Sequence, residues 1–430
     1  MSGFGAFVRQ AHAAGQLVVQ PRMGFGSVTP MRQGLMATKT AAATTVGTIT
    51  VDSYTRVGDL RAARAALRDG TDLNGYPIAV HDAHTTRHML SGVRDADFPV
   101  QVRHGSATPA PIIDALIDAG LDATEGGPVS YCLPYGRVPL ADSVANWARA
   151  CRLLARLHEH GPEPHLETFG GCMLGQLCPP SQLVALSVLE ALFFHRHGIR
   201  SSSVSYAQQG HAEQDREAVL ALRRLCSELL PGDWHVVIYA YMGLYPTTRD
   251  GAHELLAQAT ELAVRTGSER LIVKTVAESR RIPTIAENVA ALEYAAAVAR
   301  RHHFPRAPAI DGDSQTYREA RRLVEAVLLG DRDIGQALIR AFARGYLDIP
   351  YCVHPDNKGR TRSYLDADGR LGWADIGSLP LHGIAEVRPS RVPTSRDLMD
   401  ALSRVQRAFD HDRPARAMDP ARAIRKGSHG

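Results

Sequence analysis

Short runs of apolar and β-branched residues alternate with longer amphipathic stretches from Leu17 to about Thr275. Such alternation predicts parallel strands joined by right-handed helical crossovers. We expect strands at Leu17–Arg22, Gly47–Tyr54, Ile78–His81, Pro99–Arg103, His165–Phe169, Ser201–Tyr206, Trp234–Met242 and Leu271–Thr275, and a more irregular element near Thr124–Glu125. Helical patterns between them include Pro139–His160, Pro180–His197, Gln214–Leu230 and Ala252–Thr266. This series favours an α/β fold of the TIM type, a (β/α)8 barrel, over an open sheet.

The pattern changes after about residue 304. Two helical patterns, Gln315–Leu328 and Ile334–Gly345, lead into Leu347–Gly383, which is rich in Asp, Gly, Pro and Tyr and has little periodicity. We therefore expect a barrel over residues 1–304 and a smaller helical and irregular C-terminal extension, packed on the barrel, over residues 305–410. Residues 411–430 hold many Arg, Asp and Pro, which predicts a mobile tail.

The composition is that of a globular protein with a small partner or a protein partner. Of 430 residues, 44% are hydrophobic and 22% charged, and the formal net charge is +4. This balance gives no electrostatic argument for binding a nucleic acid or a membrane surface. The six cysteines are scattered, the N-terminus lacks a secretory apolar stretch, and the apolar segment Leu183–Phe194 is interrupted by Ser187 and Glu190. We expect a cytoplasmic protein with reduced thiols.

Arginines occur at the carboxyl ends of three expected strands, the side of a (β/α)8 barrel where active sites lie. They are Arg22, Arg56 and Arg103. A guanidinium group binds a carboxylate through paired hydrogen bonds and keeps its proton when buried. Three of them indicate a substrate with two carboxylates, although each alone is also explained by an ion pair within the barrel. Glu125 is placed to pair with the ammonium group of such a substrate or to take its proton.

Aromatic and imidazole side chains follow the same strands. Tyr131 and Tyr135 are expected to add hydroxyl donors and aromatic walls to the pocket, and His104 to contact a substrate or cofactor. Three further histidines are close in sequence, but without a helix or a supporting carboxylate pattern their spacing does not favour a metal site. They are His81, His84 and His88.

Several common motifs do not occur in the sequence. No G-x-G-x-x-G follows the first strand and no P-loop is present, so a dinucleotide or nucleotide site lacks its phosphate cradle. No G-x-S-x-G indicates a nucleophilic serine. Asp82–His84 and Asp233–His235 read D-x-H, but neither continues to D-x-H-x-x-G, the motif that ligates cobalamin.

Motifs along most of the chain resemble the large (epsilon) subunit of glutamate mutase, also called methylaspartate mutase. They occur in the family's order, which is far more specific than any one of them. The matching segments are Gln20–Gly24 (Q-P-R-M-G), Asp52–Arg56 (D-S-Y-T-R), Leu73–Pro77 (L-N-G-Y-P), Val100–Gly105 (V-Q-V-R-H-G), Glu125–Tyr135 (E-G-G-P-V-S-Y-C-L-P-Y), Tyr241–Pro246 (Y-M-G-L-Y-P), Ile272–Pro283 and Leu347–Pro350 (L-D-I-P).

The resemblance implies a barrel that uses adenosylcobalamin to interconvert L-glutamate and threo-3-methyl-L-aspartate by radical fragmentation and recombination. By position, it implies that the three arginines hold the substrate carboxylates and that Glu125 meets the amino group as the catalytic residue. The implied substrate-binding residues are Arg22, Arg56, Arg103, His104, Glu125, Tyr131 and Tyr135. The implied cofactor contacts are Gly24, Asn74, Pro134, Tyr245, Lys274, Glu278 and Ile282, and no metal ligand is implied in this chain.

The resemblance also implies a separate, flavodoxin-like sigma subunit that carries D-x-H-x-x-G and binds the corrin from its other side. It further implies an epsilon homodimer within a heterotetramer. The chain begins close to the first strand, so we expect the family's longer N-terminal segment to be missing. The sequence differs from the family pattern at three places: Pro128 replaces a usual glycine, Tyr245 a common phenylalanine, and Ser205–Ala207 the usual G-Y-G. We expect these differences to affect the contacts with the cofactor more than the three arginines.

Three other functions remain open at this point. The first is a cobalamin-dependent mutase that acts on a glutamate analogue in specialised metabolism. The second is a non-catalytic barrel that keeps the pocket as a binding module. The third is a lyase or aldolase that binds dicarboxylates without cobalamin. Formation of methylaspartate from glutamate distinguishes the first, and dependence on cobalamin distinguishes the third.

Overall fold

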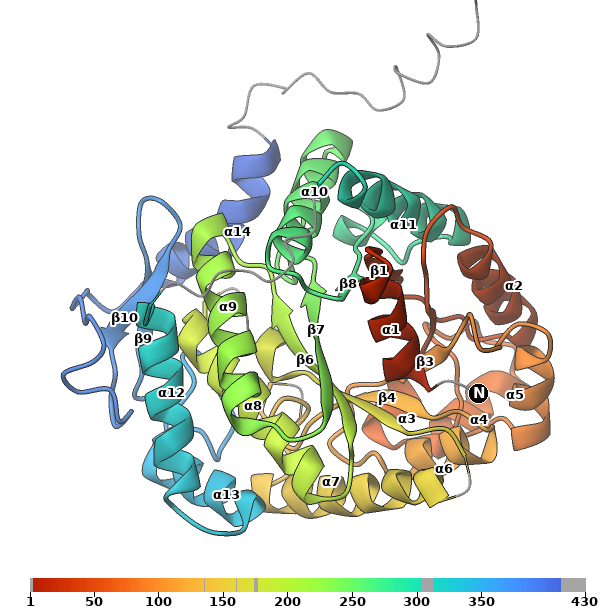
Figure 1. Cartoon of the computed structure of the whole chain (residues 1–430), viewed down its shortest axis with the longest axis horizontal. Helices are drawn as coiled ribbons and strands as arrows, with labels where there is room; N and C mark the ends of the chain where they lie inside the picture. Colours follow the sequence, from red (N-terminus) through yellow and green to blue (C-terminus); the bar gives the residue numbers. More distant parts are fainter. Residues whose placement is uncertain (1–2, 135, 160, 174–176, 303–311, 411–430) are drawn as a thin grey trace, which may run out of the picture.

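The computed structural model describes residues 3–134, 136–159, 161–173, 177–302 and 312–410. Its centre is a parallel eight-stranded barrel surrounded by helices (Figure 1), which confirms the predicted fold. The strand order is β1-β8-β7-β6-β5-β4-β3-β2, and a bridge between Val19 and Thr45 closes the circle between β1 and β2. The strands are β1 (Val18–Gln20), β2 (Gly47–Thr50), β3 (Val100–Arg103), β4 (Ala123–Gly126), β5 (His165–Thr168), β6 (Ser201–Ala207), β7 (Asp233–Tyr239) and β8 (Arg270–Ile272).

Helices connect the strands and cover the outside of the barrel. They are α1 (Phe4–Ala13), α2 (Val28–Lys39), α3 (Ser53–Val57), α4 (Leu60–Arg68), α5 (Ala83–Leu90), α6 (Ala110–Asp118), α7 (Leu140–Ala155), α8 (Pro180–Arg196), α9 (Ala212–Leu229), α10 (Arg249–Arg265) and α11 (Ile285–Ala299). Three single turns of 3-10 helix are η1 (Arg156–Glu159), η2 (Gly170–Cys172) and η3 (Val276–Ser279). Across the ranges just given, no helix has both the length and the apolar character needed to cross a membrane.

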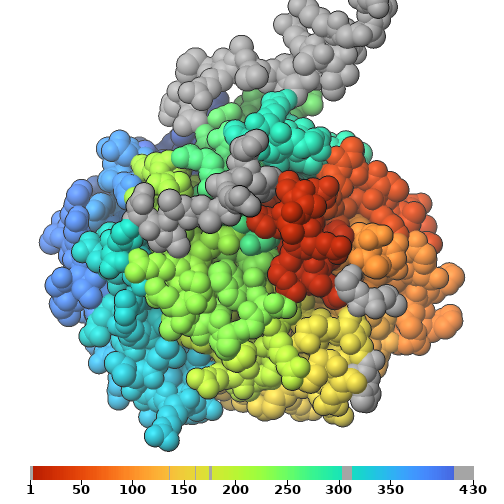
Figure 2. Space-filling view, viewed as in Figure 1, coloured from red at the N-terminus to blue at the C-terminus, as the bar shows by residue number. Residues whose placement is uncertain are grey.

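Helix α1 lies against the amino ends of the strands. It packs on β1, β6 and β7, and the ring of Phe4 stacks on that of His165 at the start of β5, with 5.1 Å between ring centroids. In the space-filling view of this face, the dark red segment of α1 fills the space between the green and orange segments (Figure 2). The opposite end of the barrel, where the strands finish, is therefore the end that is free to form a site.

One predicted strand was wrong. Ile78–His81 forms a turn, in which the amides of Val80 and His81 bond to the carbonyl of Pro77, before Asp82 caps α5. Its apolar residues resemble a strand because Ile78 is buried in the core. The irregular element near Thr124–Glu125 is instead the fourth strand, β4. Every other predicted strand overlaps an observed one.

The C-terminal part of the chain packs on the outside of the barrel. It contains α12 (Gln315–Leu328), α13 (Ile334–Arg344), the antiparallel pair β9 (Arg362–Leu365) and β10 (Leu371–Asp375), and α14 (Ser395–Asp410). Helix α12 covers α8 and α9, and α14 covers α10. The carboxylate of Asp410 accepts hydrogen bonds from Thr247 and Thr248. The predicted boundary at residue 304 and the predicted tail over residues 411–430 lie outside the described residues.

The interior of the barrel is filled by polar side chains below the carboxyl ends of the strands. Arg270 of β8 is completely buried and forms an ion pair with Glu167 of β5, and it also donates to Gln20 of β1. The amide of Gln20 donates to Gln101 of β3 at 2.8 Å. Because these buried side chains are bonded to one another across the barrel, this layer joins opposite strands and forms a rigid floor for the site above it.

Candidate active site

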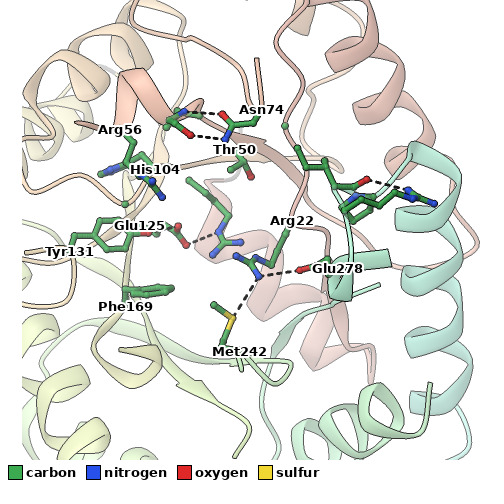
Figure 3. A pocket seen from close by; sticks show the side chains of 18 of the residues that line it. Arg22, Thr50, Arg56, Asn74, His104, Glu125, Tyr131, Phe169, Met242 and Glu278 are labelled. Atoms are coloured by element: carbon green, nitrogen blue, oxygen red, sulfur yellow. Dashed lines mark hydrogen bonds and ion pairs between the residues drawn. The ribbon is translucent and has the colours of Figure 1, made fainter. Parts of the chain in front are cut away.

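A pocket of about 660 Å³ opens at the carboxyl ends of the strands (Figure 3). Its walls come from β2 to β4, from the segments that follow most strands, and from η3 and the loop behind it. The pocket is lined by Arg22, Gly24, Thr50, Val51, Ser53, Arg56, Asn74, Arg103, His104, Gly105, Glu125, Tyr131, Phe169, Met242, Glu278, Ser279, Arg280, Arg281, Ile282 and Pro283.

The structure brings most of the predicted substrate-binding residues into this one pocket. Those that line it are Arg22, Arg56, Arg103, His104, Glu125 and Tyr131. Tyr135 lies outside the described residues. Side chains far apart in the sequence, on the ends of strands or in the segments that follow them, thus face a common volume.

The predicted cofactor contacts divide into two groups. Gly24, Asn74, Glu278 and Ile282 line the pocket. Pro134, Tyr245 and Lys274 do not. Tyr245 is 3% exposed and donates its hydroxyl to the carbonyl of Ala252, and the ammonium group of Lys274 lies 4.8 Å from the centre of the Tyr245 ring. Tyr245 and Lys274 thus pack outside the pocket, next to Glu278, which lines it.

Arg103 and Glu125 form a buried ion pair at the bottom of the pocket. The Nε of Arg103 donates to Oε2 of Glu125 at 2.7 Å, and the two side chains are 6% and 3% exposed. Glu125 also accepts hydrogen bonds from the hydroxyls of Tyr131 and Tyr239. Burial lowers the pKa of Arg103, but the combined coulombic effects of the surrounding groups, of which Glu125 has the largest, raise it well above its usual value. Arg103 is therefore already partly neutralised within the protein, as the alternative of an ion pair within the barrel allowed.

Arg22 is held on the opposite side of the pocket. Its Nη1 lies 3.2 Å from Oε2 of Glu278 in η3 and also contacts the sulfur of Met242 (Figure 3). This side chain is 32% exposed, so the pair is partly open to solvent. Lys274 lies 3.9 Å from the same oxygen of Glu278. Burial lowers the pKa of Lys274 to about 8, while Glu278 opposes and Arg22 adds to this shift.

Arg56 is on a helix rather than at the end of a strand. Strand β2 ends at Thr50, and Asp52 then caps α3 by accepting hydrogen bonds from the amides of Tyr54 and Thr55. This cap and the left-handed Gly58 limit α3 to a single short turn, whose last residues include Arg56. Among the residues that the structure describes, Arg56 has no hydrogen-bond or ion-pair partner, and its side chain is exposed.

His104 presents a neutral imidazole to the pocket. Its Nδ1 accepts a hydrogen bond from the amide of Ser106 at 3.0 Å, and its ring stacks on Trp147 with 5.7 Å between centroids. Burial, together with the charge of Arg103, lowers the pKa of His104 to about 3, so the proton of the neutral ring is on Nε2. That atom is buried and has no partner within the described part of the chain. His104 thus offers one hydrogen-bond donor to a ligand.

Glu190 of α8 fixes the loop that carries Tyr131. Its carboxylate accepts hydrogen bonds from the amides of Val129 and Ser130 and from the Ser130 hydroxyl, at 2.9 to 3.2 Å. A Cβ at Gly127 would lie 2.0 Å from this carboxylate, so only glycine fits there. Burial raises the pKa of Glu190 from 4.5 to about 7, against the effect of these hydrogen bonds.

Glu190→Gln is expected to change how stability depends on pH. Since folding raises the pKa of Glu190, stability that is complete below pH 4.5 decreases as the pH rises to about 7. Glutamine does not titrate, so the variant should not lose this stability. Between pH 4.5 and about 7, the free energy of unfolding of the variant minus that of the wild type should increase by up to roughly 3 kcal/mol. Urea unfolding at both ends of the interval measures this gain, and equal pH dependence in the two proteins would contradict it.

Sequence reasoning missed several residues of the site. Tyr239 ends β7 and bonds to Glu125, but the predicted strand ran on to Met242, so Tyr239 was not considered as a strand end. Phe169 follows β5 and lines the pocket together with Met242. Correct strand ends would have indicated Tyr239, because the last residue of each barrel strand lies next to the site.

The histidines considered for a metal site have other roles. His81 stacks on Tyr76, with 4.9 Å between ring centroids, and His84 stacks on His88 along α5. Within the described ranges no group of three or more metal-ligating side chains is present. All six cysteines, which fall in those ranges, are buried free thiols.

Comparison with known proteins identifies the family of this chain. The family model described as the methylaspartate mutase E chain matches residues 2–397. The chain belongs to this family. Because its members are mutases, the chain is an enzyme of the isomerase class.

Similar curated proteins of this family are glutamate mutase epsilon subunits. That of Halobacterium salinarum is 32% identical over 345 residues, which cover 77% of this chain and 71% of the relative. That of Haloarcula marismortui is 29% identical over 399 residues, with 90% and 81% covered. That of Yersinia enterocolitica is 29% identical over 351 residues, with 77% and 72% covered. The similarity to methylaspartate mutase E chains therefore spans both the barrel and much of the C-terminal part.

Proposed function

We propose that this chain is the large subunit of an adenosylcobalamin-dependent mutase that interconverts L-glutamate and threo-3-methyl-L-aspartate. The observation that carries the proposal is the convergence of Arg22, Arg56 and Arg103 on one pocket in a methylaspartate mutase E chain. An amino acid with two carboxylates fits such a pocket because each carboxylate can take a different guanidinium partner.

The charges that line the pocket support an anionic substrate. Five arginines and two glutamates line it, so the positive charges are in excess. The arginines are Arg22, Arg56, Arg103, Arg280 and Arg281, and the glutamates are Glu125 and Glu278. Glutamate and methylaspartate carry a net negative charge near neutral pH. A positive concave site therefore attracts them and partly restores the balance of charge on binding.

The partners of each arginine suggest how the substrate is held. Arg56 has no side-chain partner among the described residues, and His104 adds a neutral donor at Nε2. Arg22 is paired with Glu278 through one nitrogen, in a partly exposed contact, so a substrate carboxylate can replace or share this partner. We assign one substrate carboxylate to the Arg56 side and the other to the Arg22 side. If the carbon skeleton separates during the reaction, each half then remains attached to the protein through its own carboxylate.

Glu125 is the proposed catalytic residue. In the pocket its carboxylate is fixed by Arg103 and Tyr131, so it cannot turn away from a bound amino group. We propose that it accepts a hydrogen bond, and part of the proton, from the substrate nitrogen. The buried position of Glu125, 2% exposed, keeps water from competing for this contact.

The rim of the pocket fits a broad, flat cofactor. A Cβ at Gly24 would lie 2.2 Å from the carbonyl oxygen of Thr50, so the wall here is bare backbone. Asn74 is held at the rim by Ser53, and Ile282 leaves an apolar side chain 59% exposed. Bare backbone, an amide and an exposed apolar side chain suit a ring with amide substituents. Adenosylcobalamin, when bound, would supply the radical chemistry that protein side chains lack.

We also propose a separate small subunit that binds the other side of the cofactor. The relatives are named epsilon subunits, which supports a complex with other chains. The sequence lacks D-x-H-x-x-G, so the cobalt ligand is expected from the partner, a flavodoxin-like sigma subunit. Our proposal for the whole assembly is an epsilon homodimer within a heterotetramer.

Reconstitution tests the proposed function. The chain is incubated with L-glutamate, adenosylcobalamin and a small cobalamin-binding subunit, and methylaspartate is measured by chromatography. We expect product only when all of these are present. Full activity without the small subunit would contradict the proposed partner. A complex that binds cobalamin, as seen in its spectrum, but forms no methylaspartate would contradict glutamate as the substrate.

A further inference from the structure

A tyrosine hydroxyl lies between two buried glutamates below the pocket. The hydroxyl of Tyr239 is 2.8 Å from Oε2 of Glu125 and is also hydrogen-bonded to Oε1 of Glu167. Glu125 is 2% exposed, and Tyr239 and Glu167 are completely buried. This chain of three side chains connects the floor of the pocket to the polar layer within the barrel.

The hydroxyl has one proton but two carboxylate neighbours. When both glutamates are ionised, Tyr239 can donate to only one of them, and the other carboxylate faces the phenol oxygen, which also accepts a hydrogen bond from Nη2 of Arg103 at 3.3 Å. Burial raises the pKa of Tyr239 well above 10, so the phenol keeps its proton. Addition of one proton to Glu125 removes the conflict, because the new carboxyl group donates to Tyr239 while Tyr239 donates to Glu167. A proton that reaches Glu125 therefore finds an acceptor in the hydroxyl oxygen of Tyr239.

An arginine lies beside each of the two glutamates that flank Tyr239. Arg103 pairs with Glu125, and Arg270 pairs with Glu167, so each carboxylate has a cationic partner. Within the described part of the chain, other polar side chains near this group supply an imidazole, hydroxyls, a thiol and an amide. They are His104, Tyr131, Cys172, Ser203 and Gln101. A protonated Glu125 would leave one excess positive charge, which a substrate with two carboxylates compensates.

We propose that Tyr239 and Glu167 are positioning residues that make Glu125 a better proton acceptor. This inference rests on the proposed function for the source of the proton, the ammonium group of the substrate. Its N–H bond breaks as an O–H bond forms on Glu125. An ammonium and a carboxylate thereby become an amine and a carboxyl group, whose proton is donated to the hydroxyl oxygen of Tyr239. Tyr239 in turn donates to Glu167, and no further proton needs to move.

Tyr239→Phe removes the hydroxyl and keeps the ring that packs on Phe169. Without an acceptor for the proton of Glu125, the acidic limb of the kcat/KM profile should move to lower pH. We expect kcat to fall about 10- to 100-fold, with a smaller change in KM. Tyr206→Phe is the control, since it removes another buried hydroxyl, one that donates to Asp215. It should leave the profile unchanged.

Infrared spectroscopy of the full chain alone separates this inference from the proposed function. The glutamate residues of the protein are labelled with carbon-13, and the infrared bands of their protonated carboxyl groups are followed as the pH is lowered. The band that is absent from Glu125→Gln is assigned to Glu125. We expect the midpoint of this band to fall in Tyr239→Phe but not in Tyr206→Phe. An unchanged or higher midpoint would overturn the inference even in an active mutase. A lowered midpoint in a protein without mutase activity would overturn the proposed function only.

A second variant covers the case in which Tyr239→Phe does not fold. Incorporation of 3-fluorotyrosine at position 239 keeps both the ring and the hydroxyl but makes the oxygen a weaker acceptor. The midpoint for Glu125 should then fall in the same direction by a smaller amount. A midpoint that stays constant, in a protein whose circular dichroism equals that of the wild type, would contradict a role for the hydroxyl.

Discussion

Arg103→Met should abolish turnover and lower the free energy of unfolding by roughly 3–5 kcal/mol. The substitution keeps a side chain of similar length but removes the charge that pairs with Glu125 at 2.7 Å. Because both side chains are almost completely buried, the carboxylate left behind has little contact with water to replace its partner. Activity in the reconstituted complex and urea unfolding of the chain measure the two effects.

A double-mutant cycle separates the two roles of Arg103. Glu125→Gln also leaves a buried charge without its partner, so it should be destabilising as well. The double variant, Arg103→Met with Glu125→Gln, contains no unpaired charge, and we expect its loss of stability to be less than the sum of the single losses. It should remain inactive, because the site lacks both groups. Strictly additive losses of stability would show that the pair does not have the energetic coupling described here.

Arg56→Met should differ from Arg103→Met: it should weaken substrate binding strongly but hardly change the stability of the fold. Arg56 is exposed and has no partner in the described part of the chain, so its removal should change the free energy of unfolding by less than about 0.5 kcal/mol. The lost hydrogen bonds to a carboxylate should raise KM roughly 10- to 100-fold. Steady-state kinetics of the complex measures this change.

Arg61→Met is a matched control for Arg56→Met. Arg61 is an exposed arginine on α4, the next helix, and it does not line the pocket. Its substitution should leave both KM and stability unchanged. An equal increase in KM in both variants would mean that the general positive charge, rather than a contact of Arg56 with the substrate, attracts the ligand.

The barrel was predictable from the sequence because its strands and helices repeat with clear periods. Errors arose where burial came from tertiary contacts. Ile78 is buried in a turn and therefore resembles a strand residue, while β4 is hidden by its short length and by Gly126 at its end. Helix α14 was not predicted, and its amphipathic residues lie beyond the irregular segment that dominates this part of the chain.

The arginines of the site were predictable, but their partners were not. Arg22 follows the end of β1, and this strand end can be recognised from the local sequence pattern. Its ion pair with Glu278 joins residues that are 256 positions apart, and no local pattern indicates it. The same holds for Tyr239 and Glu167, which are 72 positions apart and meet only because the barrel closes. Such pairings depend on the register of the strands, which the sequence pattern does not specify.

The most direct test of the account follows one carbon of the substrate. L-Glutamate labelled with carbon-13 at C3 is incubated with the chain, the small subunit and adenosylcobalamin, and nuclear magnetic resonance locates the label. We expect that C3 becomes the methyl carbon of 3-methylaspartate, and that Arg56→Met slows the appearance of this signal at low glutamate concentration. A complex with bound cofactor that leaves the label in glutamate, or releases it in a cleavage product, would contradict the account.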